Sequence, residues 1–212
     1  MTNFIYRREN ALSKSLCKSF IDTFELDTEN QTKGVVRRGD KIGPYEGKTS
    51  TDISFTPNDL NRPRWKFLLT KLINTLELGK RDYTQYFYRG MEMLDPWEIN
   101  HCFNMQRYLP GEGYSDYHCE RAGLATYNRM GVWMIYLNDV YDRGWTEFYY
   151  QQHFEKAEAG KLVIWPTDFT HLHRGIISHT ETKYVLTGWY SFVESPEERM
   201  KKQKRDIQNE KS

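Results

Sequence analysis

The chain has 212 residues, of which 28% are charged and 38% hydrophobic, and its formal net charge at pH 7 is +1. This length suffices for one well-buried core and gives no reason to expect a second domain. The composition is that of a globular protein, and the apolar runs are too short for a transmembrane helix. The nearly neutral charge, without a basic stripe in the core, makes nucleic acid the weakest candidate partner.

The cysteines and the amino terminus bear on the cellular compartment. Three cysteines without paired metal-ligand spacing fit a reducing environment. The opening MTNFIYRREN has no apolar stretch of the kind found in secretory signals. We therefore expect a cytoplasmic protein with no membrane association. Its oligomeric state is left open.

The first 82 residues predict a helical part. Residues 10–25 form an amphipathic helix with Asn10 as the candidate N-cap, and residues 58–76 form a second one with an apolar face that includes Trp65. Between them, residues 27–48 are polar and glycine-rich and read as a loop, and residues 49–55 alternate weakly like a strand.

Short β segments separated by turn signals follow from about residue 83. We predict strands at 98–109, 132–138, 146–150, 161–165, 170–174 and 184–193. Helices followed by strands indicate an α+β fold with helices packed on one side of a β core. We expect one domain over residues 1–194, with a helical part (1–82) and a core (83–194), and a polar tail (195–212) that is disordered or a solvated helix.

The triplet His118-Cys119-Glu120 is the first candidate for chemistry. In an extended chain, residues i and i+2 point to the same side, about 6.6 Å apart. The triplet therefore offers one imidazole and one carboxylate to a common point, two thirds of the facial triad that suits non-haem Fe(II). Alone the pattern is weak, because a surface histidine near an unrelated glutamate is common.

Further candidates follow about fifty residues downstream. The stretch GKLVIWPTDFTHLHRG predicts a buried strand, a turn with Pro166, and then His171 and His173. As residues i and i+2 of an extended segment, these two histidines would face the same side, and either could complete the triad. Lys183 comes next, at the head of the strand KYVLTGWYSF, where an ammonium aimed into a β core suits the distal carboxylate of a five-carbon diacid. A single histidine or lysine of this kind usually has a structural role. That role explains less easily why all of them occur together, in this order and at workable spacing.

Together these motifs resemble the signature of 2-oxoglutarate oxygenases, particularly the prolyl 4-hydroxylase-like branch. NMQRYLPGEGYSDYH before the first ligand, VWMIYLND, GWTEF and AGKLVIWP are similar to the strands around that signature. The opening helix and KTSTDIS also resemble that branch, so the likeness covers roughly residues 10–193. It implies a double-stranded β-helix (jelly-roll) core.

The resemblance also implies the cofactor and the reaction. His118, Glu120 and His171 would bind Fe(II), Lys183 would pair with the C5 carboxylate of 2-oxoglutarate, and Tyr108 and Tyr136 would line the co-substrate pocket. With O₂, 2-oxoglutarate would be decarboxylated to succinate and CO₂ while a substrate C–H bond is hydroxylated, and ascorbate would support turnover.

The distal histidine is the ambiguous part of this assignment. Counting forward from Pro166 favours His171, whereas counting back from Lys183 favours His173. We prefer His171, because the loop that follows it varies in length more easily than the turn before it. His173 and Arg174 are then candidates to face the substrate. The sequence also departs from the family in having Glu120 in place of the commoner aspartate and Trp145 in place of a glycine.

Several functions stay open at this stage. The first expectation is hydroxylation of a prolyl residue in a peptide or protein, followed by a free amino acid or another small molecule. A non-catalytic jelly-roll binding module and a cupin-type metalloprotein are alternatives of other classes, which the carboxylate and Lys183 disfavour. A halogenase is disfavoured because Glu120 occupies the position that halide would need.

Overall fold

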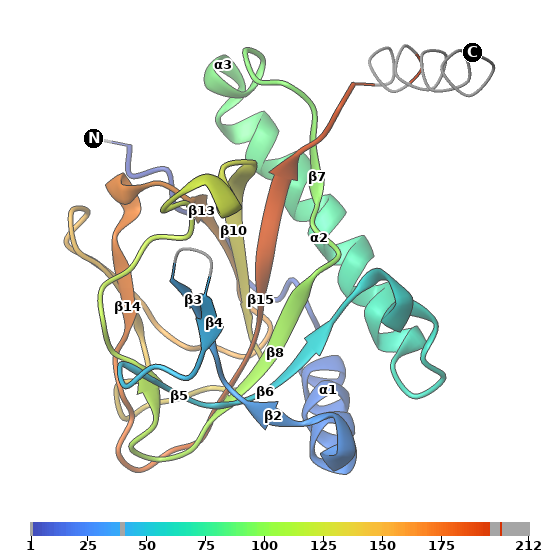
Figure 1. Cartoon of the computed structure of the whole chain (residues 1–212), viewed down its shortest axis with the longest axis vertical. Coiled ribbons are helices and arrows are strands. Elements are labelled where there is room, and N and C mark those ends of the chain that lie inside the picture. Colours follow the sequence, from blue (N-terminus) through green and yellow to red (C-terminus); the bar gives the residue numbers. More distant parts are fainter. Residues whose placement is uncertain (1, 39–40, 196–199, 201–212) are drawn as a thin grey trace.

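A large antiparallel sheet forms the centre of the computed structural model, which describes residues 2–38, 41–195 and 200 (Figure 1). Its strands, in spatial order, are β1 (Tyr6–Arg8), β13 (Leu162–Pro166), β10 (Arg129–Tyr136), β15 (Lys183–Phe192), β8 (Phe103–Tyr108), β6 (Thr51–Phe55) and β2 (Thr32–Lys33). The short β7 (Trp97–Ile99) also pairs with β15. This sheet is the platform on which the site is built.

Smaller β units accompany the large sheet. A three-stranded sheet has the order β12 (His153–Glu155), β11 (Thr146–Phe148), β14 (His173–Gly175). Two further pairs are β3 (Val36–Arg38) with β4 (Lys41–Gly43), and β5 (Lys48–Thr49) with β9 (Gly113–Tyr114). Several of these short strands fall in residues 27–48, which we expected to be a loop. That expectation was wrong, because β2 and β5 pair with the later strands β6 and β9, and β3 and β4 pair with each other as a hairpin.

Among residues 2–38 and 41–195 the α-helices are α1 (Lys14–Leu26), α2 (Lys66–Tyr86) and α3 (Tyr88–Met91). The predicted N-cap of the first is corrected: Ser13 accepts a hydrogen bond from Leu16 N at 3.2 Å, whereas Asn10 has a positive φ of 53°. The second helix begins eight residues later than predicted, after Pro63, because the residue before a proline is disfavoured in helical conformation. No helix among the described residues is long and apolar enough to span a membrane.

Two hydrophobic clusters lie on opposite faces of the large sheet. Along β10, Trp133 belongs to the cluster shared with Phe20 and Leu72 of the helices, whereas its neighbour Val132 belongs to the cluster shared with Phe148 of the smaller sheet. Successive residues of a strand point to opposite faces, so one strand serves both clusters. The helices thus cover one face, as the α+β prediction expected, and the other face is left for the site.

Most of the predicted strands coincide with observed strands but differ from them in extent. The predicted strand 98–109 is interrupted, since β7 ends at Ile99 and β8 begins at Phe103. The predicted strand 170–174 is instead a 3-10 turn, Phe169–His171, followed by β14 from His173. The predicted tail falls outside the described residues, apart from Ser195 and Met200.

Candidate functional site

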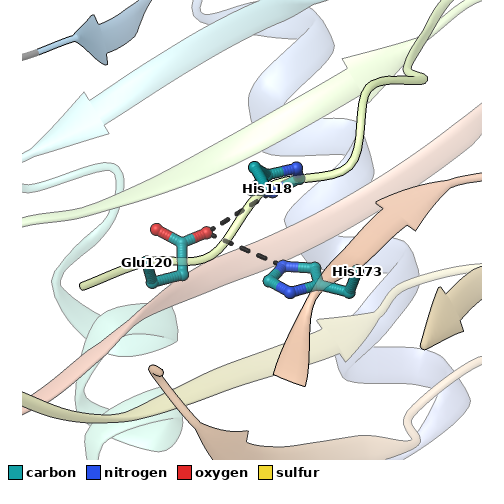
Figure 2. A group of neighbouring side chains, drawn as sticks. All are labelled: His118, Glu120 and His173. Carbon is teal, nitrogen blue, oxygen red and sulfur yellow. Dashed lines mark ion pairs between the residues drawn. The ribbon is translucent and has the colours of Figure 1, made fainter. Parts of the chain in front are cut away.

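Three side chains from two distant segments converge on one point (Figure 2). His118 Nε2 lies 3.6 Å from Glu120 Oε1, and His173 Nε2 lies 3.8 Å from the same oxygen. Two donor atoms that each lie about 2.1 Å from one metal ion are about 3 to 4 Å apart. Both separations therefore suit a shared cation, and the donor set of two imidazoles and one carboxylate is that of a facial triad.

The backbone aligns the two histidines directly. His118 N donates to His173 O and His173 N donates to His118 O, each at 2.9 Å, so an antiparallel bridge joins the loop after β9 to the start of β14. The ring of Tyr114 stacks on that of His118 with centroids 3.7 Å apart and planes at 9°. Glu120 is anchored through its backbone N–H, which donates to Thr167 O at 3.0 Å.

Hydrogen bonds at Nδ1 prepare both imidazoles for metal binding. His118 Nδ1 lies 2.9 Å from Asp116 O, and His173 Nδ1 lies 2.9 Å from His171 O. A carbonyl only accepts, so Nδ1 carries the proton and Nε2 keeps its lone pair facing Glu120. Burial lowers the pKa of both histidines, most strongly that of His173, which favours the neutral form that a metal ligand requires.

His171 does not belong to this group, and our preference for it is corrected. Its Nε2 donates to Asn3 O at 2.9 Å, on the amino-terminal segment, and its Nδ1 lies 3.1 Å from Thr170 Oγ1. The argument that His171 and His173 share a face required a strand through both. A 3-10 turn ends at His171, so the two imidazoles diverge, and His173 joins the triad instead of facing the substrate.

The triad opens on a cavity of about 440 Å³, within the usual range for small-ligand sites. Lys183 lines this cavity, is only 7% exposed, and donates to Gly144 O at 3.1 Å. Among the described residues no carboxylate pairs with it, and burial lowers its pKa to about 8. A buried ammonium without an anionic partner beside a cavity is suited to the carboxylate of a ligand.

The two predicted co-substrate tyrosines differ in position. Tyr108 lines the cavity, with Lys183 Nζ 4.9 Å from its ring centroid and its hydroxyl donating to Gln106 Oε1 at 2.7 Å. Tyr136 does not line the cavity itself. Its hydroxyl lies 2.7 Å from Oγ1 of Thr146, and Thr146 lines the cavity. Burial raises the pKa of both phenols, so they stay protonated hydrogen-bond partners.

Arg174, the other residue expected to face a substrate, borders the cavity, but its guanidinium contacts other side chains of the protein. Its Nε donates to Glu147 Oε2 at 2.6 Å, and its Cζ lies 4.4 Å from the ring centroid of Tyr117. It follows His173 on β14, and alternation along the strand turns it away from the metal group. Arg174 is therefore not a free anion-binding group.

Two residues at the site were missed from the sequence. Trp189 lines the cavity and donates its Nε1–H to Glu120 Oε2 at 3.0 Å. Arg129 was not singled out at all, yet it lines the cavity and forms an ion pair with the same oxygen at 3.2 Å. Neither stands at a recognisable spacing from Glu120, so only the fold brings them together.

A family model matches part of the chain. The model of the 2OG-Fe(II) oxygenase superfamily matches residues 103–191, the segment that runs from β8 to β15 and contains all three triad residues. A comparison with curated proteins found no match.

Several solved structures share the fold at low sequence identity. A prolyl-4-hydroxylase from Pseudomonas putida covers 91% of this chain and 95% of its own, with TM-score 0.63 and 16% identity. The viral collagen prolyl hydroxylase from Paramecium bursaria Chlorella virus-1 covers 90% and 97%, with TM-score 0.57 and 15% identity. The prolyl hydroxylase from Trichoplax adhaerens, in complex with a hypoxia inducible factor oxygen degradation domain peptide fragment, covers 90% and 84%, with TM-score 0.66 and 14% identity. These likenesses confirm the predicted jelly-roll fold.

Proposed function

We propose that this chain is an Fe(II)- and 2-oxoglutarate-dependent dioxygenase that hydroxylates a prolyl residue in a peptide or protein, which its partial match to the 2OG-Fe(II) oxygenase model and its fold support. The observation that carries the proposal is the convergence of His118, Glu120 and His173 beside a cavity. The same cavity is lined by Lys183, which is buried and has no carboxylate partner among the described residues.

The metal would be held by Nε2 of His118, Nε2 of His173 and one oxygen of Glu120. Bound there, Fe(II) with 2-oxoglutarate and O₂ supplies the oxidant that hydroxylates a C–H bond, with succinate and CO₂ as the other products. The chain's own contribution is to keep both imidazoles neutral, to fix their Nε2 atoms toward Glu120, and to enclose the reacting groups among buried side chains such as Trp165.

Lys183 would bind the distal carboxylate of 2-oxoglutarate. Its ammonium has one neutral acceptor, Gly144 O, and is buried, so a charge-assisted bond to a carboxylate would offset its desolvation. Tyr108, whose ring lies beside that ammonium, would form the adjoining wall. This arrangement orients a diacid with one end on Lys183 and its oxo-acid end toward the triad.

The charges around the cavity favour a peptide over a free amino acid. Three of the cations that line it are already paired within the chain: Arg129 with Glu120, Arg174 with Glu147, and Lys48 with Asp52. Of the lysines and arginines among the described residues that line the cavity, Lys183 alone lacks a carboxylate partner, and the co-substrate would bind to it. The α-carboxylate of a free amino acid would therefore lack a cation, whereas an internal residue of a peptide needs none.

The jelly-roll shared with prolyl hydroxylases makes proline the first residue to test. Purified protein would be incubated with Fe(II), 2-oxoglutarate, ascorbate and air, against panels of prolyl peptides and of free amino acids. We expect succinate together with a peptide that has gained one oxygen atom. Succinate coupled only to a free amino acid would overturn the prolyl assignment, and no turnover of 2-oxoglutarate with any substrate would overturn the activity. The cytoplasmic location stays a prediction.

A further inference from the structure

The carboxylate of Glu120 has two oxygens with different surroundings. Oε1 faces the imidazoles of His118 and His173, at 3.6 and 3.8 Å. Oε2 points to the opposite side, where it accepts hydrogen bonds from Trp189 and Arg129. We propose that Arg129 and Trp189 clamp Oε2 and so keep Glu120 a one-oxygen metal ligand, an inference that rests on the proposed metal site.

Arg129 is fixed by more than one contact. Its Nη1 donates to Glu120 Oε2 at 3.2 Å and to the backbone carbonyl of Glu120 at 3.0 Å. Its guanidinium also lies over the ring of Trp189, with Cζ 3.5 Å from the ring centroid. A planar, delocalised cation is able to stack and donate at once, whereas the ammonium of a lysine is not. Arg129 thus contacts both the side chain and the backbone of residue 120.

Trp189 supplies the second bond to the same oxygen. The indole Nε1–H is a donor only, and it reaches Glu120 Oε2 at 3.0 Å across 69 residues of sequence. Two donors on Oε2 leave Oε1 as the oxygen that is available to a cation. Charge-assisted hydrogen bonds of this kind are among the strongest that a carboxylate makes, so rotation that would present both oxygens to a metal is opposed.

The expected consequence concerns the coordination number of the metal. Two imidazoles and one carboxylate oxygen leave three of six octahedral positions open, which a chelating co-substrate and O₂ require together. A carboxylate free to bind through both oxygens would leave only two. The clamp also accounts for a glutamate at a position where aspartate is commoner, because the longer side chain places one oxygen at the clamp and the other at the imidazoles.

Metal affinity tests the clamp without any turnover. Mn(II) would be titrated into full-length wild-type protein and into Arg129→Met, Arg129→Lys and Trp189→Phe, each checked for folding by its unfolding temperature. Loss of an outer partner of a metal ligand typically weakens binding by about 10- to 100-fold, and we expect this for Arg129→Met. Arg129→Lys should recover only part of the affinity, and Trp189→Phe, which keeps the stack and loses the N–H, should weaken binding less than Arg129→Met.

Arg121→Met is the matched control. Arg121 is the residue after Glu120 and forms its own ion pair, with its Nε 2.8 Å from Asp168 Oδ1, and it neither bonds to the Glu120 carboxylate nor lines the cavity. Its replacement should leave the Mn(II) dissociation constant within a factor of about two to three of wild type. Equal weakening by Arg121→Met and Arg129→Met would mean that the effect is general loss of order in the loop, and would overturn the proposal.

The number of water molecules on bound Mn(II), measured by water-proton relaxation, gives a second readout. We expect three waters in wild type and fewer in Arg129→Met, where Glu120 is free to bind through both oxygens. An unchanged water number and affinity in Arg129→Met would overturn the clamp while leaving the metal site intact. Failure of the wild type to bind Mn(II) would instead overturn the proposed metal site itself.

Discussion

Replacing Lys183 with methionine should make the protein more stable and less able to use 2-oxoglutarate. Lys183 is buried, and its ammonium has one neutral acceptor, Gly144 O at 3.1 Å. Burial alone lowers its pKa from 10.5 to about 8, which means that the fold opposes the charge. Methionine fills a similar volume with an apolar chain and removes this cost.

The magnitude follows from the pKa. Since each pKa unit corresponds to 1.36 kcal/mol, lowering the pKa from 10.5 to about 8 destabilises the charged form by roughly 3 kcal/mol. Lys183→Met also loses the hydrogen bond to Gly144 O, which reduces the gain in stability by about 1 kcal/mol. Lys183→Met should therefore be about 2 kcal/mol more stable at pH 7. For a chain of this size, that corresponds to an unfolding temperature about 4–8 °C higher.

The pH dependence has a defined sign. Between about pH 8 and 10.5 the unfolded chain holds the Lys183 proton and the folded chain does not, so wild-type stability contains a contribution that rises with pH in this window. The advantage of Lys183→Met should shrink through the same window. Over pH 6–8 its KM for 2-oxoglutarate should be about ten- to a hundredfold higher than that of wild type, as expected for loss of a charge-assisted bond of about 1.5–3 kcal/mol.

Chemical denaturation at several pH values, together with steady-state kinetics, would measure both effects. Lys161→Met is the control, because Lys161 is equally buried but lies 3.6 Å from Glu155 and 3.2 Å from Glu158. Breaking that pair should cost about 3–5 kcal/mol. If Lys183→Met were destabilised like the control and kept its KM, Lys183 would be a structural residue and our reasoning would be refuted.

Three further predictions concern the metal and the co-substrate. His173→Ala should abolish Mn(II) binding in a calorimetric titration, whereas His171→Ala should retain it with weaker affinity, and the reverse order would restore His171 as the ligand. The kcat/KM for 2-oxoglutarate should fall as pH rises through about 8, because Lys183 then loses its proton, and this fall should be missing from Lys183→Met. Mn(II) at a hundred times its dissociation constant should stabilise the wild type by about 2.7 kcal/mol and Glu120→Ala hardly at all, so equal stabilisation of both would place the metal elsewhere.

The sequence predicted the core of the site because its elements have strong local signals. The spacing of His118 and Glu120 required only a short extended segment, and Lys183 begins β15 as expected. Apolar runs such as residues 162–165 are buried on both faces and form a strand in almost any β arrangement. The α+β order of helices and strands followed from the same patterns.

The errors arose where tertiary pairing overrides local pattern. Alternation placed His171 and His173 on one face, but a 3-10 turn held by Asn3, 168 residues away along the chain, separates them. The short β1 strand exists because it pairs with β13, and nothing within Tyr6–Arg8 marks it as a strand. The contacts of Trp189 and Arg129 with Glu120 likewise depend on how β15 and β10 lie beside the loop, which sequence spacing does not encode.

A crystal structure with Mn(II) and an inert 2-oxoglutarate analogue would test the central claim most directly. We expect one metal ion per chain, in contact with Nε2 of His118, Nε2 of His173 and one oxygen of Glu120, with the distal carboxylate of the analogue on Lys183. A metal ion bound by His171, or an analogue whose distal carboxylate pairs with another cation, would contradict this account.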